Sequence, residues 1–238
     1  MNRILTLEQA ARHIQFDARE LLHLAQRGEI ASRRRGDEYF FEHQVIDEWA
    51  QRHLMSQPAK FLRLRHRDAM RQARKSIEDD RVIESLLKPE WIDAAMPSRT
   101  RPGVIRDMVA LGLRTELLYD DVVLQQAVEE REEVASTAIG EGAAFLHPRF
   151  HDPYLAAGSF ITFGRTVRPI FFGAPDGLTT DLFFLICCVN DVEHIHVLAR
   201  LCLLMHGTDL AEQLREAPDA NAIYQLLTAA EKEFLSTL

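Results

Sequence analysis

The stretch from Glu129 to His147 constrains the fold most strongly, because its pattern changes several times over a short distance. Charged residues typical of a helix end lead into a short strand, a turn at Gly140 and Gly142, and a second apolar strand at 143–146. His147 follows that strand directly. A neutral imidazole at a strand end can act as a nucleophile through one nitrogen while a partner holds the other. The pattern therefore predicts strands beside helices and makes His147 a candidate functional residue.

The composition indicates a globular protein with a substantial core. The chain has 238 residues, of which 47% are hydrophobic and 27% charged, which fits one or two domains. It contains no apolar run long enough for a membrane span, and we expect no signal peptide because the first residues lack the apolar core of one. The cysteines, among them the adjacent Cys187 and Cys188, form neither a disulfide framework nor a CxxC metal motif. We therefore expect a cytoplasmic protein with no metal or other cofactor, in which this pair packs in the core.

The charge of the chain is unevenly distributed. Residues 1–78 hold 15 Lys and Arg and 11 Asp and Glu (net +4), whereas residues 79–238 hold 13 and 25 (net −12). A basic front and an acidic back indicate two units with different partners, and the basic front suits nucleic acid. We predict a first domain at 1–54, a basic linker at 55–80 and a second domain at 81–238.

The first domain shows the order helix, tight turn, helix, β-hairpin, helix. Thr6 precedes a predicted helix at 7–13, and Asp17 precedes a second helix that ends at Gly28. A hairpin with a Gly-Asp turn is predicted within 30–41, and a third helix over 42–53. This is the outline of a winged helix-turn-helix.

The same segment resembles the excisionase/MerR-like DNA-binding module. The matching motifs are Leu5-Thr6-Leu7-Glu8-Gln9-Ala10-Ala11, Gly28-Glu29-Ile30 and Ile46-Asp47-Glu48-Trp49. The resemblance implies DNA binding, and the second helix offers candidates for the major groove in Arg19, His23, Gln26 and Arg27. The hairpin offers candidates for phosphate contacts in Arg33, Arg34 and Arg35. A plain solvated face is the alternative for these residues, and a homodimer is expected because such modules often bind DNA as dimers.

Helical and strand-like patterns interleave after residue 80. Helices are predicted at 81–87, 101–113, 119–133, 193–206, 208–216 and 219–235, and strands at 135–138, 143–146, 156–163 and 180–189. This order predicts an α/β domain in which helices flank a mixed sheet.

Nearly all of residues 81–230 is similar to the IIA domains of the bacterial sugar phosphotransferase system, in the fructose/mannitol and nitrogen-regulatory class. The motif around the family's phosphorylated histidine is matched by Arg131-Glu132, Ser136-Thr137, Ile139-Gly140, Gly142, Ala144 and His147, and the segment with its second histidine by Glu193-His194-Ile195. The resemblance implies that His147 accepts a phosphoryl group from a histidine phosphocarrier protein. It further implies that His194 orients the phosphate and that Arg131 stabilises its charge. Phosphoryl transfer depends mainly on positioning and charge compensation, which these residue types supply.

The chain departs from the family motif beside the histidine. Leu146 and Pro148 stand where the family usually has proline and glycine, and Pro148 removes a backbone N–H next to the site. A further histidine, His151, lies nearby. Three interpretations follow: a regulator that binds DNA and is phosphorylated on His147, a phosphocarrier whose helix-turn-helix docks a protein, and a IIA scaffold that is not phosphorylated and binds a partner.

Overall fold

The structure is a computed structural model that describes residues 4–14, 16–36, 38–56, 81–148, 154–206 and 208–237. The chain divides into two compact units, Met1–Ser76 and Ile77–Leu238, which are called unit 1 and unit 2 below. Residues 57–80 of the predicted basic linker, and His151, lie outside the described residues.

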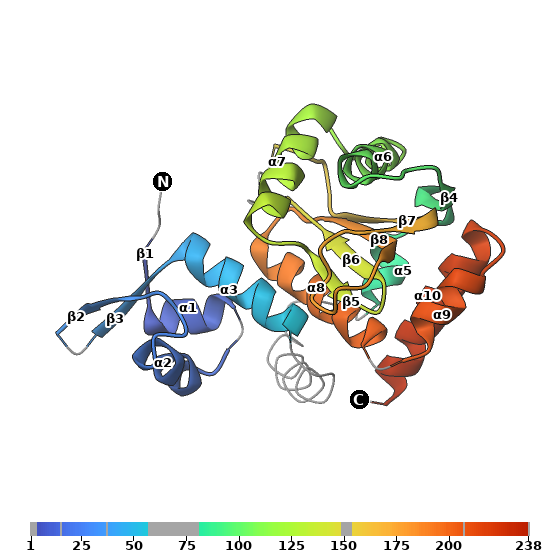
Figure 1. The fold of residues 1–238 in the computed structure, drawn as a ribbon. Coiled ribbons are helices and arrows are strands. Elements are labelled where there is room, and N and C mark those ends of the chain that lie inside the picture. Colours follow the sequence, from blue (N-terminus) through green and yellow to red (C-terminus); the bar gives the residue numbers. More distant parts are fainter. Residues whose placement is uncertain are drawn as a thin grey trace. The chain divides into compact units, whose positions relative to one another are not determined.

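The described part of unit 1 combines three helices with a small antiparallel sheet (Figure 1). The helices are α1 (Leu7–His13), α2 (Ala18–Gln26) and α3 (His43–Ser56), and the strands are β1 (Ile4–Thr6), β2 (Arg33–Arg35) and β3 (Glu38–Glu42). The strand order is β1-β3-β2, so the predicted hairpin is extended by a strand that the sequence did not predict. β1 is only three residues long and ends at the N-cap of α1. Such a short segment is too short for an alternating pattern of apolar and polar residues to be recognised.

The first two helices of unit 1 begin where their capping residues predicted. The Thr6 side chain accepts a hydrogen bond from the Gln9 N–H, and the Gln9 side chain accepts one from the Thr6 N–H, which makes a capping box. The Asp17 carboxylate accepts from the N–H groups of Arg19 and Glu20. Gly28, with a φ of +73°, follows α2 in the left-handed conformation that favours glycine.

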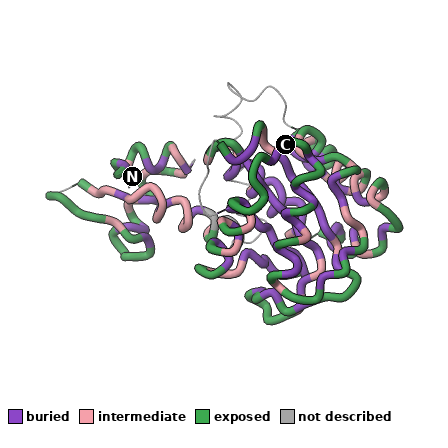
Figure 2. The backbone as a smooth tube through the Cα atoms, turned by 90° about the horizontal axis from the view of Figure 1, so that it is seen from above, coloured by how far each residue is buried: buried purple, intermediate pink, exposed green. Residues whose placement is uncertain are grey.

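The described part of unit 2 is a five-stranded mixed sheet with helices on both faces, as predicted (Figure 1). Its strands are β4 (Ile92–Met96), β5 (Ala138–Gly140), β6 (Ala143–Leu146), β7 (Phe160–Ile170) and β8 (Thr180–Cys187), in the order β4-β7-β8-β6-β5. The pairs β4/β7 and β6/β8 are parallel, and the other neighbours are antiparallel. β8 lies at the centre and is buried along nearly its whole length, as Figure 2 shows for the strands of this core.

The helices of unit 2 cover the sheet from both sides. They are α5 (Val82–Leu86), the 3-10 helix η1 (Pro89–Trp91), α6 (Arg101–Leu113), α7 (Asp121–Val134), α8 (Asp191–Met205), α9 (Leu210–Glu216) and α10 (Ala220–Ser236). In Figure 1, α6 and α7 lie on one side of the sheet, and α8, α9 and α10 on the other. None of the described helices is both long and apolar enough to cross a membrane.

Three strands of unit 2 differ clearly from the sequence prediction. β5 lies at Ala138–Gly140 instead of the predicted 135–138, so the two ranges share one residue. β4 was not predicted, because Asp93 interrupts a short apolar stretch. β7 continues to Ile170, beyond its predicted end at 163, since Arg165 and Arg168 obscure the apolar pattern there. The prediction for Cys187 and Cys188 is confirmed: both are buried free thiols, and burial raises the pKa of Cys187 to about 12.

A buried ion pair joins α10 to α8. Arg200 Nη1 donates to Glu231 Oε1 at 2.7 Å, and both side chains are almost completely shielded from solvent. The other carboxylate oxygen accepts a hydrogen bond from the Ile83 N–H at 2.9 Å, at the start of α5. Burial raises the pKa of Glu231, and the neighbouring Arg200 opposes that shift. One carboxylate thus holds three helices of unit 2 together.

The substitution Glu231→Gln keeps an oxygen for the Ile83 N–H but removes the negative charge that faces the buried Arg200 guanidinium. We expect it to lower the free energy of unfolding of unit 2 by about 3–5 kcal/mol. Urea denaturation in a Trp49→Phe background, followed by the fluorescence of the buried Trp91, measures this. The exposed Glu233→Gln on the same helix is the control and should change the free energy of unfolding by less than about 0.5 kcal/mol. Equal effects of the two substitutions would contradict the role given to the ion pair.

Candidate functional site

Unit 2 brings together the three residues that the sequence singled out for chemistry. Arg131 lies in the last turn of α7, His147 follows β6, and His194 lies in the first turn of α8. Arg131 Nε lies 3.1 Å from His147 Nε2, and the rings of His147 and His194 are 4.8 Å apart between centroids, at an angle of 54°. All three side chains are buried.

The topology of the sheet explains this convergence. β6 runs parallel to β8, with Leu146 paired to Leu185, so the carboxyl ends of both strands meet at the same edge of the sheet. His147 stands at the end of β6, and α8 begins shortly after β8, where the Asn190 side chain accepts a hydrogen bond from the Glu193 N–H. The carboxyl edge of parallel strands is where open α/β sheets commonly place their sites.

The hydrogen bonds of His147 define its protonation. An arginine Nε–H can only donate, so His147 Nε2 accepts from Arg131 through its lone pair. His147 Nδ1 lies 2.8 Å from the carbonyl oxygen of Phe145, which can only accept, so Nδ1 carries the proton. Both contacts are satisfied together by the neutral imidazole. Its Nε2 is thus the nitrogen available for nucleophilic attack.

Hydrogen bonds fix the chain directly after Arg131, and they include Glu132 and Thr137, to which the sequence assigned no individual role. Arg131 Nη1 donates to the Ala135 carbonyl oxygen at 2.9 Å. The buried carboxylate of Glu132 accepts from both the N–H and the hydroxyl of Thr137, and it pairs with Arg101 at the start of α6. The connection from α7 to β5, which follows Arg131 directly, is therefore fixed by these contacts. Glu132 and Thr137 belong to the matched motif, but their contacts depend on how this connection folds.

The glycine turn between β5 and β6 is tight, as predicted. Gly140 and Gly142 have φ values of +91° and +77°, and Glu141 between them also has a positive φ. A side chain at Gly142 would collide with the guanidinium of Arg215, which donates to the Glu141 carbonyl and the Asp181 carboxylate. The absence of a side chain at Gly142 thus makes room for Arg215 of the same chain.

The candidate DNA contacts all lie in unit 1. The exposed candidates are Arg19, His23 and Gln26 on α2, Arg27 directly after it, and Arg33, Arg34 and Arg35 on β2. Several of them already have partners. Arg33 pairs with Glu42 at 2.5 Å, and Arg34 Nε donates to the Gly36 carbonyl oxygen at 2.8 Å.

Comparison with known proteins identifies unit 2. The family model of the phosphoenolpyruvate-dependent sugar phosphotransferase system, EIIA 2, matches residues 85–230. The chain belongs to this family. A nitrogen regulatory protein of Bradyrhizobium diazoefficiens is 33% identical over 151 residues, which is 61% of this chain and 94% of that protein.

Solved structures support the IIA fold of unit 2. The nitrogen regulatory protein IIA-Ntr of Neisseria meningitidis matches with a TM-score of 0.56 at 24% identity, over 61% of this chain and 99% of that one. The mannitol IIA enzyme of Escherichia coli, in a complex with its phosphorylated IIB enzyme, matches with a TM-score of 0.52 at 19% identity, over 60% and 97%.

The protonation of His147 can be tested in solution. A long-range ¹⁵N–¹H correlation spectrum of the histidine rings should show one ring with a proton on Nδ1 and none on Nε2 at neutral pH, because Arg131 occupies the Nε2 lone pair. His147→Ala assigns the signal. The opposite tautomer at His147, with the proton on Nε2, would show that the contact with Arg131 does not form as described.

Proposed function

We propose that His147 accepts a phosphoryl group from a histidine phosphocarrier protein, as one step of a phosphotransferase relay. The observation that carries this proposal is the lone pair on Nε2, which faces Arg131 while the Phe145 carbonyl holds the opposite nitrogen. In the transfer, Nε2 forms a bond to phosphorus while the bond from phosphorus to the carrier's histidine nitrogen breaks. The electron pair of that bond returns to the carrier's nitrogen.

Arg131 and His194 supply the charge compensation in this proposal. The Arg131 Nε–H leaves the lone pair of His147 and donates to a phosphoryl oxygen instead, where a guanidinium fork fits well. His194, whose ring lies 4.8 Å from that of His147, orients the same group. Because these side chains are buried, they must move aside for the phosphoryl donor to reach Nε2. In this proposal Leu146 and Pro148 flank His147 without contributing to the contacts of its two ring nitrogens, which are made by Arg131 and the Phe145 carbonyl oxygen.

A phosphorylation assay tests the site directly. The full chain is incubated with phosphoenolpyruvate, the general phosphotransferase enzyme and its histidine phosphocarrier, and acid-labile phosphate is read by intact mass. We expect one phosphoryl group per chain, none in His147→Ala, and a transfer rate reduced about 10²–10³-fold in Arg131→Ala, as for removal of one preorganised donor. His206→Gln is the histidine control and should retain the label.

The outcome separates the interpretations of unit 2. Label that persists in His147→Ala would place the phosphoryl group on another residue. A wild-type chain without label would favour the IIA fold as a scaffold for partner binding. Continued transfer from the labelled chain to an acceptor protein would favour a phosphocarrier over a regulator.

We propose further that unit 1 is a winged helix-turn-helix of the excisionase/MerR-like type that binds DNA, which would make the chain a cytoplasmic regulator. The order β1, α1, α2, β2, β3, α3 and the exposed basic residues on α2 and β2 support this proposal. Phosphate contacts at Arg33 would replace its exposed ion pair with Glu42. Such a pair costs little to break, since surface ion pairs contribute about 0–1 kcal/mol.

The combined substitution of Arg33, Arg34 and Arg35 by alanine tests DNA binding. On duplex DNA of mixed sequence, we expect weaker binding and a slope of log K against log salt that is shallower by about 2–3, because each lost phosphate contact removes about 0.9. The control replaces Arg99, Arg114 and Arg168, exposed residues of unit 2, and changes the net charge equally. Equal losses in both variants would contradict a specific role of β2. No binding to duplex DNA by the wild type would favour docking of a protein.

A further inference from the structure

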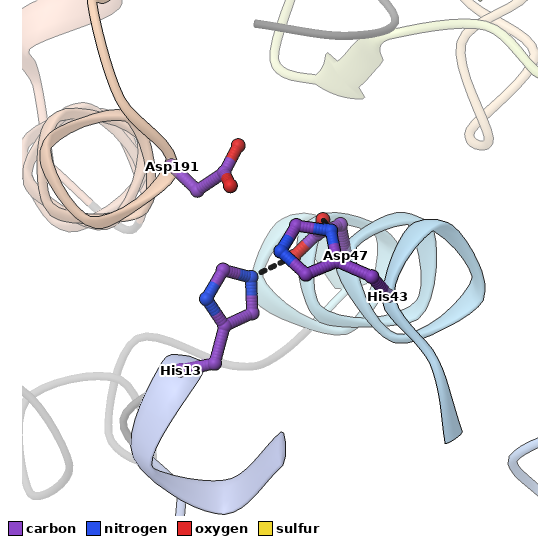
Figure 3. Close-up of side chains that lie close together, drawn as sticks. All are labelled: His13, His43, Asp47 and Asp191. Carbon is purple, nitrogen blue, oxygen red and sulfur yellow. Dashed lines mark hydrogen bonds and ion pairs between the residues drawn. The ribbon is translucent and has the colours of Figure 1, made fainter. Parts of the chain in front are cut away.

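A cluster of two histidines and an aspartate in unit 1 is not used by the functions proposed above. His13 is the last residue of α1, His43 is the first residue of α3, and Asp47 follows one turn later. His13 Nε2 lies 2.6 Å from Asp47 Oδ1, and His43 Nδ1 lies 3.0 Å from Asp47 Oδ2 (Figure 3). The two imidazole rings are 4.3 Å apart between centroids.

The local fold directs these three side chains toward one point. His43 and Asp47 are four residues apart on α3 and therefore lie on the same face of the helix. β3 leads directly into α3, and α1 packs against β3, which brings the end of α1 to the first turn of α3. The side chains are 15% (His13), 17% (Asp47) and 22% (His43) exposed. An ion from solvent can therefore reach them, while most of their surface is shielded.

We propose that His13, His43 and Asp47 bind a divalent transition-metal ion of the zinc class. Two imidazole nitrogens and one carboxylate oxygen are a donor set that suits Zn²⁺, Co²⁺ and Ni²⁺. The three donor atoms lie within 4.8 Å of one another, close enough to share one ion. Zinc takes four ligands in most protein sites, so one position remains for water or another donor.

Binding of the metal ion at this cluster would release protons from the two histidines. Both histidines direct a ring nitrogen at the Asp47 carboxylate, and the hydrogen bonds there require a proton on each of those nitrogens. A metal ion takes the place of these protons, and it binds only the deprotonated nitrogens. The bound ion would tie the end of α1 to the start of α3. No metal was expected from the sequence, because the cysteines form no CxxC motif and His13 and His43 lie thirty positions apart, which is not a recognised ligand spacing.

Direct titration of the full chain, without a polyhistidine tag, tests the site. Co²⁺ is the probe, since its visible absorption reports coordination by protein nitrogen, and Zn²⁺ is then added as competitor. We expect one Co²⁺ per chain, displaced by Zn²⁺. Asp47→Asn and His13→Gln should each weaken binding by more than about 100-fold, because even the loss of a second-shell partner of a metal site costs about 10–100-fold.

Three controls make the outcome decisive. His206→Gln removes a histidine of similar exposure from unit 2, where its side chain is 18% exposed, and should bind Co²⁺ like the wild type. His147→Ala should also bind normally, which excludes the pair formed with His194 as the site. Circular dichroism checks that Asp47→Asn and His13→Gln remain folded. Unchanged binding in both of these folded variants, loss of binding in His147→Ala, or no binding by the wild type would each overturn the proposal.

Discussion

The parallel pairing of β6 with β8 is the constraint on which the candidate site depends. It places the end of β6, and with it His147, at the edge of the sheet where α8 begins with His194. Neither the sequence around β6 nor that around the start of α8 brings His147 and His194 together by itself. The pairing is stable because both strands are buried, and β8 is covered by helices on both faces. A shift of one residue in this register would turn the side chains of β6 to the opposite face of the sheet.

Buried charges around the site are each matched by a specific partner. Arg131 meets the lone pair of His147 and the Ala135 carbonyl oxygen, while Glu132 meets Arg101 and Thr137. Removing a charge of this kind from water is costly unless such contacts replace the lost hydration. The same rule applies to Arg200 and Glu231 on the far side of the sheet. The charges of α7 thus serve both the stability of the connection to β5 and the orientation of the imidazole.

Much of the fold and of the site in unit 2 could be predicted from the sequence. The bounds of α6 and β6 match their predicted ranges, because Thr100 caps the helix and a glycine turn precedes the strand. The residues Arg131, His147 and His194 were named through the family resemblance, and the structure places them together. The predictions failed where polar residues interrupt an apolar strand, as at Asp93 in β4, because such a strand is stabilised by its neighbours rather than by its own pattern.

The sequence by itself determined the local elements, since caps, turns and apolar periodicity act over a few residues. It also determined which histidine follows the strand at 143–146. The tertiary structure decided the protonation of His147, because that depends on Arg131 and on the Phe145 carbonyl oxygen at once. It likewise decided the meeting of His13, His43 and Asp47 in unit 1. Contacts between residues far apart in the chain follow from how helices and strands pack, and no short-range pattern records them.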